Sequence, residues 1–483
     1  MNKLIYFAIV FLTTVSVFSC SSNSSEETFE SKMFPEYDEI TIPYNIAPLN
    51  FKIEGANSIN VKIKGDSEYS FRFRGSLADF RVGKWHRMLE REKGNTLSVT
   101  VSSKRGKDFS RTLKWQISED AIDKYLSYRL IEPAYEVWNE IQIEERDMEN
   151  FKARLIADNN TADKSCVNCH TSNKNGTSFM HLRGDNGGTI LNRDGRITKL
   201  NTKTDSTMGG AVYGDISNDG RYGVFTAANI KFAIHSLRSK RMEVYDTASD
   251  LIVIDFDSLT VTDGSTIKGT EFQETFPCFS ADGKTIFFCR ARHLEQPDST
   301  KYMMYDVAAV SFDPQTGRVG DKVYTVLSSE RHNASFSHLK CSPDGKFLMV
   351  TAAAYGTFPI WHEESELWLI NLRTGAVNLM SSANERFADT YHSWSSNSRW
   401  VVFASKRDDK IYGRPYVVHI DEEGTVSRAF LLPQRNPDYY NITLKSFNLP
   451  ELYSLPEIYN ARDISDIYND SKIESVTYKS DYK

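Results

Sequence analysis

Basic runs are missing from this chain of 483 residues, and neither sign of charge is strongly in excess. Lys and Arg number 58 and Asp and Glu number 64, which gives a formal net charge of −6. Proteins that bind nucleic acid usually carry a clustered basic surface, so no nucleic-acid partner is expected. The Gly-x-Ser-x-Gly sequence of an α/β-hydrolase nucleophile is absent as well. These absences favour a binding or electron-transfer protein over an enzyme.

Apolar runs long enough for a lasting membrane span are not apparent either. The run from Leu4 to Phe18 is short and begins almost at the first residue. It ends in Val17-Phe18-Ser19-Cys20, which resembles a lipoprotein signal with a lipidated cysteine. The resemblance implies a signal peptide over residues 1–19, a lipid on Cys20 and a polar tether over residues 20–37. We then expect an exported protein anchored to the outer membrane, on its periplasmic or surface side; an ordinary signal peptide is the alternative.

Cysteine is scarce, yet two of the six cysteines lie in Cys166-Val167-Asn168-Cys169-His170. The pattern C-x-x-C-H is typical of c-type haem attachment, in which both thiols bond the haem vinyl groups and the histidine ligates iron. It predicts one haem c, with thioethers at Cys166 and Cys169 and an axial ligand at His170. A zinc site needs four ligands, and His181 is the only close candidate for completing one. Two further alternatives stay open: a redox role for the two cysteines, and a remnant motif that binds no haem.

The other three cysteines, Cys278, Cys289 and Cys341, lie in apolar strand contexts and are expected in the core. A Cys278–Cys289 disulfide remains an alternative in an oxidising compartment.

A short turn recurs through the second half of the chain, each time before an apolar strand. It reads Ser217-Asn218-Asp219-Gly220, Ser280-Ala281-Asp282-Gly283, Ser342-Pro343-Asp344-Gly345 and, with departures, Ser395-Ser396-Asn397-Ser398. Asp-Gly suits a tight hairpin because glycine accepts a positive φ. Further strands follow each turn, and the unit recurs at roughly 50–60 residues, which is typical of propeller blades.

These turns resemble those of TolB-type, WD-repeat-like β-propellers over roughly residues 165 to 430. The resemblance implies an all-β fold with a propeller over residues 121–435, of five or six blades, six being preferred. A fifth turn, anchored at Ser172, puts the C-x-x-C-H motif on the innermost strand of its blade, beside the central channel. An earlier blade is expected between Tyr128 and Ile156.

The flanking segments differ from the repeats. Alternation such as Ile59-Asn60-Val61-Lys62-Ile63 predicts a small antiparallel β-sandwich-like domain over residues 38–120. The Tyr- and Asp-rich segment of residues 436–483 is expected to be a surface extension, partly disordered.

Blade topology predicts that one end of the propeller gathers polar aromatic residues and arginines. The residues expected on this binding face are Phe358, Trp361, His362, Tyr391, His392, Arg407, Tyr412 and Arg414. The alternative is that Trp361 caps the core and the arginines are solvated. Candidates for a second, distal iron ligand are Met180, His181, His338 and His392.

Two functions follow as hypotheses. The first is an electron-transfer lipoprotein with one haem c on a propeller scaffold. The second is a propeller without redox chemistry that holds a protein, peptide or glycan at the cell envelope.

Overall fold

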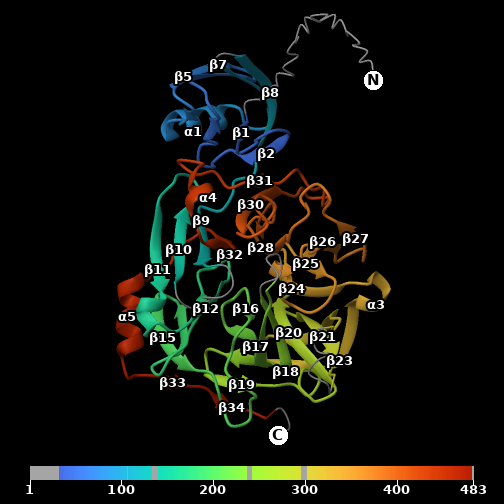
Figure 1. Ribbon diagram of the computed structural model, residues 1–483. Coiled ribbons are helices and arrows are strands. Elements are labelled where there is room, and N and C mark those ends of the chain that lie inside the picture. Colours follow the sequence, from blue (N-terminus) through green and yellow to red (C-terminus); the bar gives the residue numbers. More distant parts are fainter. Residues whose placement is uncertain (1–31, 106, 133–139, 237–241, 295–301, 481–483) are drawn as a thin grey trace, which may run out of the picture.

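The computed structural model describes residues 32–105, 107–132, 140–236, 242–294 and 302–480. Within these ranges it does not describe the side chains of residues 104, 105, 107, 108 and 169. The predicted signal peptide, the predicted lipid site at Cys20 and most of the predicted tether lie outside these ranges. Figure 1 shows a small N-terminal domain at one end of a larger ring of sheets. Within the described ranges, none of the helices combines the length and apolar character needed to cross a bilayer.

Two sheets and a helix form the N-terminal domain. The five-stranded sheet has the order β2 (Ile40–Pro43), β8 (Lys107–Ser118), β7 (Thr96–Arg105), β4 (Ser58–Lys64), β5 (Glu68–Arg74), and the smaller sheet has the order β1 (Met33–Phe34), β3 (Phe51–Ile53), β6 (Leu77–Ala78).

This domain is not the purely antiparallel sandwich that alternation predicts. Strand β2 pairs with β8 in parallel, and α1 (Val82–Arg91) packs its Trp85 against Trp115 of β8, with ring centroids 5.7 Å apart. The helix could have been found from Trp85, Met88 and Leu89, which recur at helical spacing and are all buried.

Six sheets of four or five strands follow one another along the described chain. The first contains β32 (Ser446–Tyr453), β9 (Tyr125–Ile131), β10 (Ile141–Asp147) and β11 (Ala153–Asp158). The second contains β12 (Val167–Ser172), β13 (Ser178–Leu182), β14 (Gly188–Arg193), β15 (Arg196–Asn201) and β33 (Glu474–Ser475). The third contains β16 (Gly214–Ile216), β17 (Tyr222–Ile234), β18 (Met242–Asp255), β19 (Thr260–Thr262) and β34 (Thr477–Tyr478).

The last three sheets have four strands each. The fourth contains β20 (Phe272–Phe279), β21 (Thr285–Arg292), β22 (Asp306–Asp313) and β23 (Arg318–Leu327). The fifth contains β24 (Ser335–Cys341), β25 (Phe347–Ala353), β26 (Glu366–Asn371) and β27 (Val377–Leu379). The sixth contains β28 (Thr390–Trp394), β29 (Trp400–Ser405), β30 (Arg414–His419) and β31 (Phe430–Leu431). Short helical segments between the sheets are η1 (Asn159–Ala162), α3 (Ser329–His332) and α4 (Tyr439–Ile442). A further one, η2 (Pro359–Trp361), lies within the fifth sheet between β25 and β26.

The first strands of these sheets form a closed ring. Strand β32 contacts β12, and the contacts continue through β16, β20, β24 and β28 back to β32. Each sheet therefore points one edge at a common axis, which is the arrangement of a β-propeller, and we call the sheets blades. The predicted all-β propeller class is confirmed.

The predicted surface extension is wrong for much of residues 436–483. Strand β32 is the innermost strand of the first blade, where it pairs with β9. Helix α5 (Ala461–Asn469) contacts β11 and η1, and β33 and β34 add parallel outer strands to the second and third blades. In Figure 1 this red segment runs around the lower edge of the ring. The polar composition of the segment misled the prediction because its pairing partners lie between 217 (Thr260 to Thr477) and 328 (Tyr125 to Tyr453) residues earlier in the chain.

The recurring turns have one hydrogen-bond pattern. In the fifth blade the Ser342 hydroxyl donates to Asp344 at 2.7 Å and accepts from the backbone N–H of Phe347 at 2.9 Å. Gly345 has φ +71° and closes the turn onto the carbonyl of Ser342. Ser217, Ser280 and Ser395 repeat both serine contacts. The turn of the second blade is anchored by Asn173 rather than Ser172, because the Asn173 side chain accepts from the N–H groups of Asn175 and Thr177.

The cysteine pair Cys278–Cys289 forms no disulfide. Both residues are free thiols in one apolar cluster, and in the strand register Cys278 lies opposite Phe287 while Cys289 lies opposite Thr275.

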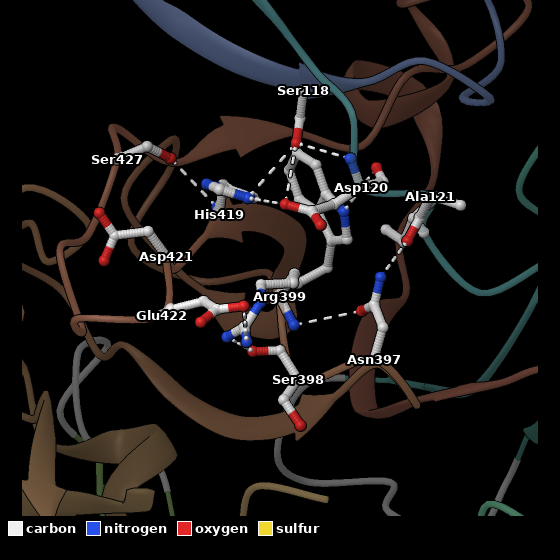
Figure 2. A network of polar contacts seen from close by, with 12 residues as sticks. Ser118, Asp120, Ala121, Asn397, Ser398, Arg399, His419, Asp421, Glu422 and Ser427 are labelled. Atoms are coloured by element: carbon white, nitrogen blue, oxygen red, sulfur yellow. Dashed lines mark hydrogen bonds and ion pairs between the residues drawn. The ribbon is translucent and has the colours of Figure 1, made fainter. Parts of the chain in front are cut away.

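A polar network joins the N-terminal domain to the sixth blade (Figure 2). The Asp120 carboxylate lies 2.8 Å from Nε2 of His419, and the Asn397 amide donates to the carbonyl of Ala121 at 2.7 Å. Nearby, Asp123 accepts from the backbone and hydroxyl of Ser396. Beside these contacts the apolar core runs continuously from the N-terminal sheets into the fifth, sixth and first blades.

Candidate functional site

The innermost strands share an irregularity that directs side chains into the channel. In five of them the pairing with the second strand shifts over two residues, as at Cys169 and His170 of β12. In the equivalent shifts Phe276, His338, Tyr391 and Leu449 have positive φ, a conformation that side chains seldom adopt. Such bulges re-aim a side chain, here toward the propeller axis.

Four aromatic rings contact one another in sequence along the channel wall; the first pair is stacked, the second tilted and the third edge-on. The centroid distances are 4.5 Å for Tyr213–Phe276, 4.3 Å for Phe276–His338 and 4.6 Å for His338–Tyr391. We call Tyr213, Phe276, His338 and Tyr391 the aromatic belt. The belt divides the channel into two levels because cavities lie on both of its sides.

The channel-mouth cavity lies at the end where the second and third strands of the blades are joined. It holds about 1130 Å³, its open mouth included. The C-x-x-C-H motif contributes Cys166 and Asn168 to its wall. Its apolar lining comes from several blades and is formed by Ile131, Ile141, Val212, Ile230, Phe232, Met242, Val244, Phe358, Ile360, Trp361 and Phe447.

A long hairpin of the third blade contributes part of this wall. Strands β17 and β18 have 13 and 14 residues, and their distal halves carry Ile230, Phe232, Met242 and Val244. Met242 and Val244 pack with Ile360 and Trp361 of the fifth blade, which places the hairpin along the channel mouth.

Charged groups stand among these apolar side chains. Among the described residues, Arg129, Arg183 and Lys406 line the cavity together with one carboxylate, that of Glu132. The Lys406 ammonium lies 3.0 Å from the centroid of the Trp361 ring. Arg129 is 8% exposed, and the described residues give its guanidinium neither a hydrogen bond nor a counter-ion; its Nε is buried without a partner. The cavity is therefore apolar with an excess of positive charge.

His170 lies at the level of the belt. It lines a smaller cavity together with belt residues, with His392 and with Lys340. Both ring nitrogens are buried, and neither has a hydrogen-bond partner within the part of the chain that the structure describes. Burial lowers the pKa of His170, so its imidazole is neutral near pH 7 and has a lone pair free to ligate a metal.

An ion cluster closes the channel below the belt. The Lys340 ammonium lies 3.5 Å from carboxylate oxygens of Asp215 and Glu451 and donates to the Thr171 hydroxyl at 3.3 Å. Burial opposes the charge of Lys340, but the two carboxylates raise its pKa above the usual value. Because β24 stands opposite β12 in the ring, this contact spans the channel, which is narrow at this level.

The four candidates for a distal iron ligand lie in different surroundings. Met180 is 1% exposed in the core of its blade and lines neither cavity. His392 has its Nε2 3.1 Å from the carbonyl oxygen of Met349. His181 pairs in register with Asn168 and lines the channel-mouth cavity. His338 is part of the aromatic belt and lines the cavity of His170 from the opposite strand.

The residues predicted as one binding face divide into separate groups. Phe358 and Trp361 line the channel-mouth cavity, whereas Arg407, Tyr412 and Arg414 line a cleft beside the N-terminal domain. Tyr391 and His392 lie at the belt.

Three residues of that set are held by contacts within the fold. Arg407 pairs with Asp389 at 2.7 Å, and Arg414 donates to the carbonyl of Tyr440 at 2.6 Å. His362 is enclosed beside Glu364. These contacts therefore hold loops together, which the sequence could not distinguish from ligand binding.

Sequence reasoning missed Arg129 and the long hairpin. A signal for Arg129 existed, because it is the single charged residue in the apolar strand Tyr125-Leu126-Ser127-Tyr128-Arg129-Leu130-Ile131. A charged residue in such a strand calls for a partner.

Several of the groups that a haem c needs are present, although Cys166 and His170 line two different cavities. The channel-mouth cavity offers an apolar wall, a cysteine of the motif and cationic side chains, and His170 offers unpartnered ring nitrogens. Burial raises the pKa of Cys166, which is therefore a thiol, the form that adds to a vinyl group. The side chain of Cys169 lies outside what the structure describes. Among the described residues no group of three or more His, Cys, Asp or Glu is placed to hold a metal ion.

The fold class is that of β-propellers, and solved structures of this class resemble the chain. No protein-family model matches it, and no curated protein matches it either. TolB from Acinetobacter baumannii shares 12% identity, covers 74% of this chain and 80% of its own, and has a TM-score of 0.43. The periplasmic gluconolactonase PpgL of Pseudomonas aeruginosa shares 15% identity over 64% of this chain and 97% of its own, with a TM-score of 0.35. Hydrazine synthase of Kuenenia stuttgartiensis shares 8% identity over 68% of this chain and 46% of its own, with a TM-score of 0.43.

Proposed function

We propose that this propeller carries one covalent haem c at the channel mouth and serves in electron transfer at the cell envelope. The observation that supports the proposal is the position of the C-x-x-C-H motif. Cys166 lies in the wall of an apolar cavity, and His170 presents ring nitrogens without a partner. When bound, the haem would supply a one-electron redox centre.

Each part of the chain has a defined role in this proposal. Cys166 and Cys169 would hold the haem through thioethers, and His170 would ligate its iron. The apolar wall, with Phe358 and Trp361, would keep water from most of the macrocycle. His338 and His181 each line a cavity shared with a motif residue and are the better placed candidates for a second ligand. His392 also lines the cavity of His170, but its Nε2 lies beside the carbonyl oxygen of Met349.

The proposed location rests on the sequence. The N-terminal segment resembles a lipoprotein signal, and C-x-x-C-H motifs receive haem outside the cytoplasm. We therefore place the protein at the envelope, anchored by a lipid on Cys20, with a redox partner of the same compartment.

A pyridine haemochrome spectrum of the mature protein tests the proposal. The protein is purified from a host that attaches c-type haem and is extracted with acidic acetone. We expect about one haem per chain with a c-type band that resists extraction. The double variant Cys166→Ser, Cys169→Ser should lose covalent haem and keep its β-sheet circular dichroism.

Two further variants separate attachment from ligation. Cys341→Ser, which changes a cysteine away from the motif, should keep a full haem content. His170→Ala should change the visible spectrum of any haem that stays attached, because the iron loses its axial nitrogen. Haem that is absent from the native chain, or extractable from it, contradicts the proposal and favours a propeller that binds another ligand in the same cavity.

A further inference from the structure

Arg129 differs from the other buried arginines of the described chain. Three arginines are less than one tenth exposed, namely Arg129, Arg146 and Arg414. Arg414 donates to the carbonyl oxygens of Tyr440 and Lys445. Arg146 donates to the carbonyl oxygen of Pro433 through one nitrogen, while its Nε and Nη1 are buried without a partner among the described residues. Arg129 has no such partner among the described residues, although its strand neighbours are apolar.

A buried cation without a partner costs the folded state free energy. Removing the charge from water costs free energy whether or not an anion is near. Proteins usually offset this desolvation cost by placing an opposite charge beside the buried one. Among the described residues, the channel-mouth cavity carries this cost at Arg129, on the first blade. A cost of this kind is typical of functional sites, where stability is given up for binding.

The surroundings of Arg129 suit an anionic group on an apolar body. The cavity wall is mostly apolar, and three cationic side chains face a single carboxylate, Glu132. Arginine binds carboxylates through two parallel N–H donors, and such bonds are strong where water is excluded. An apolar molecule that ends in a carboxylate would satisfy both the wall and the guanidinium.

We propose that Arg129 binds a carboxylate of the ligand in the channel-mouth cavity, and that this carboxylate is a haem propionate. The second half of this statement rests on the proposed haem. Arg183 is exposed and lines the same cavity, so it is placed to meet a second propionate at the rim.

The test uses the full chain purified without haem, from a host that lacks the attachment machinery. Its probes are mesoporphyrin IX, the dimethyl ester of mesoporphyrin IX and palmitate, each titrated by fluorescence. The ester keeps the apolar body and loses both charges. Arg129→Met keeps the length of the side chain and removes the charge, Arg129→Lys keeps the charge, and Arg462→Gln, on the exposed side of α5, is the matched control.

We expect the native chain to bind mesoporphyrin about tenfold or more tightly than its ester. Arg129→Met should abolish that preference, Arg129→Lys should retain part of it, and Arg462→Gln should leave it unchanged. Without ligand, Arg129→Met should melt at a higher temperature than the native chain, because it no longer buries an unpaired charge. A structural arginine would show the opposite shift.

The outcomes separate this inference from the proposed function. Equal affinity for acid and ester, or no binding of any probe, overturns the role of Arg129 even if the haemochrome test succeeds. Binding of palmitate through Arg129 without binding of mesoporphyrin supports the carboxylate site and overturns its assignment to a propionate.

Discussion

Asp246 shows at the scale of one residue how burial changes chemistry. It lies on β18, is 3% exposed, and its Oδ2 has no hydrogen-bond partner. Desolvation raises the pKa of Asp246 to about 7. A hydrogen bond from Thr275 favours the carboxylate and opposes part of this rise. The neighbouring Glu274 has its pKa raised to about 7 by the same cause, partly opposed by Arg290.

The sign of the pH dependence follows from these shifts. Between about pH 4 and pH 7 the folded chain keeps a proton on Asp246 that the unfolded chain has released. The free energy of unfolding therefore falls as the pH rises through this window and is level above it. The same argument applies to Glu274, so both acids destabilise the fold at pH 8.

Asp246→Asn should raise the free energy of unfolding at pH 8 by about 2 kcal/mol and change it little at pH 4. The amide is neutral at every pH and has nearly the same shape. Urea unfolding at both pH values measures the difference, with Asp321→Asn, on an 83% exposed side chain, as the control. A slope between pH 4 and pH 7 should persist in the variant because Glu274 still titrates. Equal stabilisation at both pH values would show that Asp246 is already ionised in the fold.

At the scale of the element, the recurring turn is held by contacts between residues that lie close together in the sequence. The Ser342 hydroxyl bonds only to residues two and five positions later, and Gly345 supplies the positive φ. Such contacts join residues close together in the sequence, so a short sequence pattern was enough to predict the blades. The long hairpin of β17 and β18 was not, because its distal half depends on packing against η2 of another blade.

Ser342→Ala should lower the free energy of unfolding by about 1–2 kcal/mol, because the Phe347 N–H and the Asp344 carboxylate each lose a bond. Thermal unfolding measures the loss. Ser381→Ala, on an exposed loop residue, should change the melting temperature very little. If the two variants melt together, the serine contact is not what holds the turn.

At the scale of the whole molecule, the ring is closed by pairing rather than by a covalent bond. Strand β32 comes from the C-terminal segment and β9 from the start of the propeller, and they form one blade. The N-terminal domain shares a continuous core with three blades and is tied to the sixth by Asp120 and His419 (Figure 2). The molecule should therefore unfold as few cooperative units.

Two truncations test the closure. Removal of residues 446–483 deletes β32, leaves β9 with an unpaired edge at the channel, and should abolish a cooperative thermal transition. Removal of residues 461–483 deletes α5, β33 and β34 and should lower the melting temperature while the transition stays cooperative. Calorimetry distinguishes the two. An unchanged transition after the larger deletion would mean that the other five blades are stable as an open ring.

The sequence by itself determined what depends on neighbours in the chain. The turns of Ser217, Ser280 and Ser342, the strands after them and the place of Cys166–His170 on an innermost strand followed from short-range pattern. The tertiary structure alone decided the ring closure by β32, the grouping of Phe358 and Trp361 with Cys166, and the isolation of Arg129. These features join residues from blades far apart in the chain, and burial and pairing exist only once those blades meet.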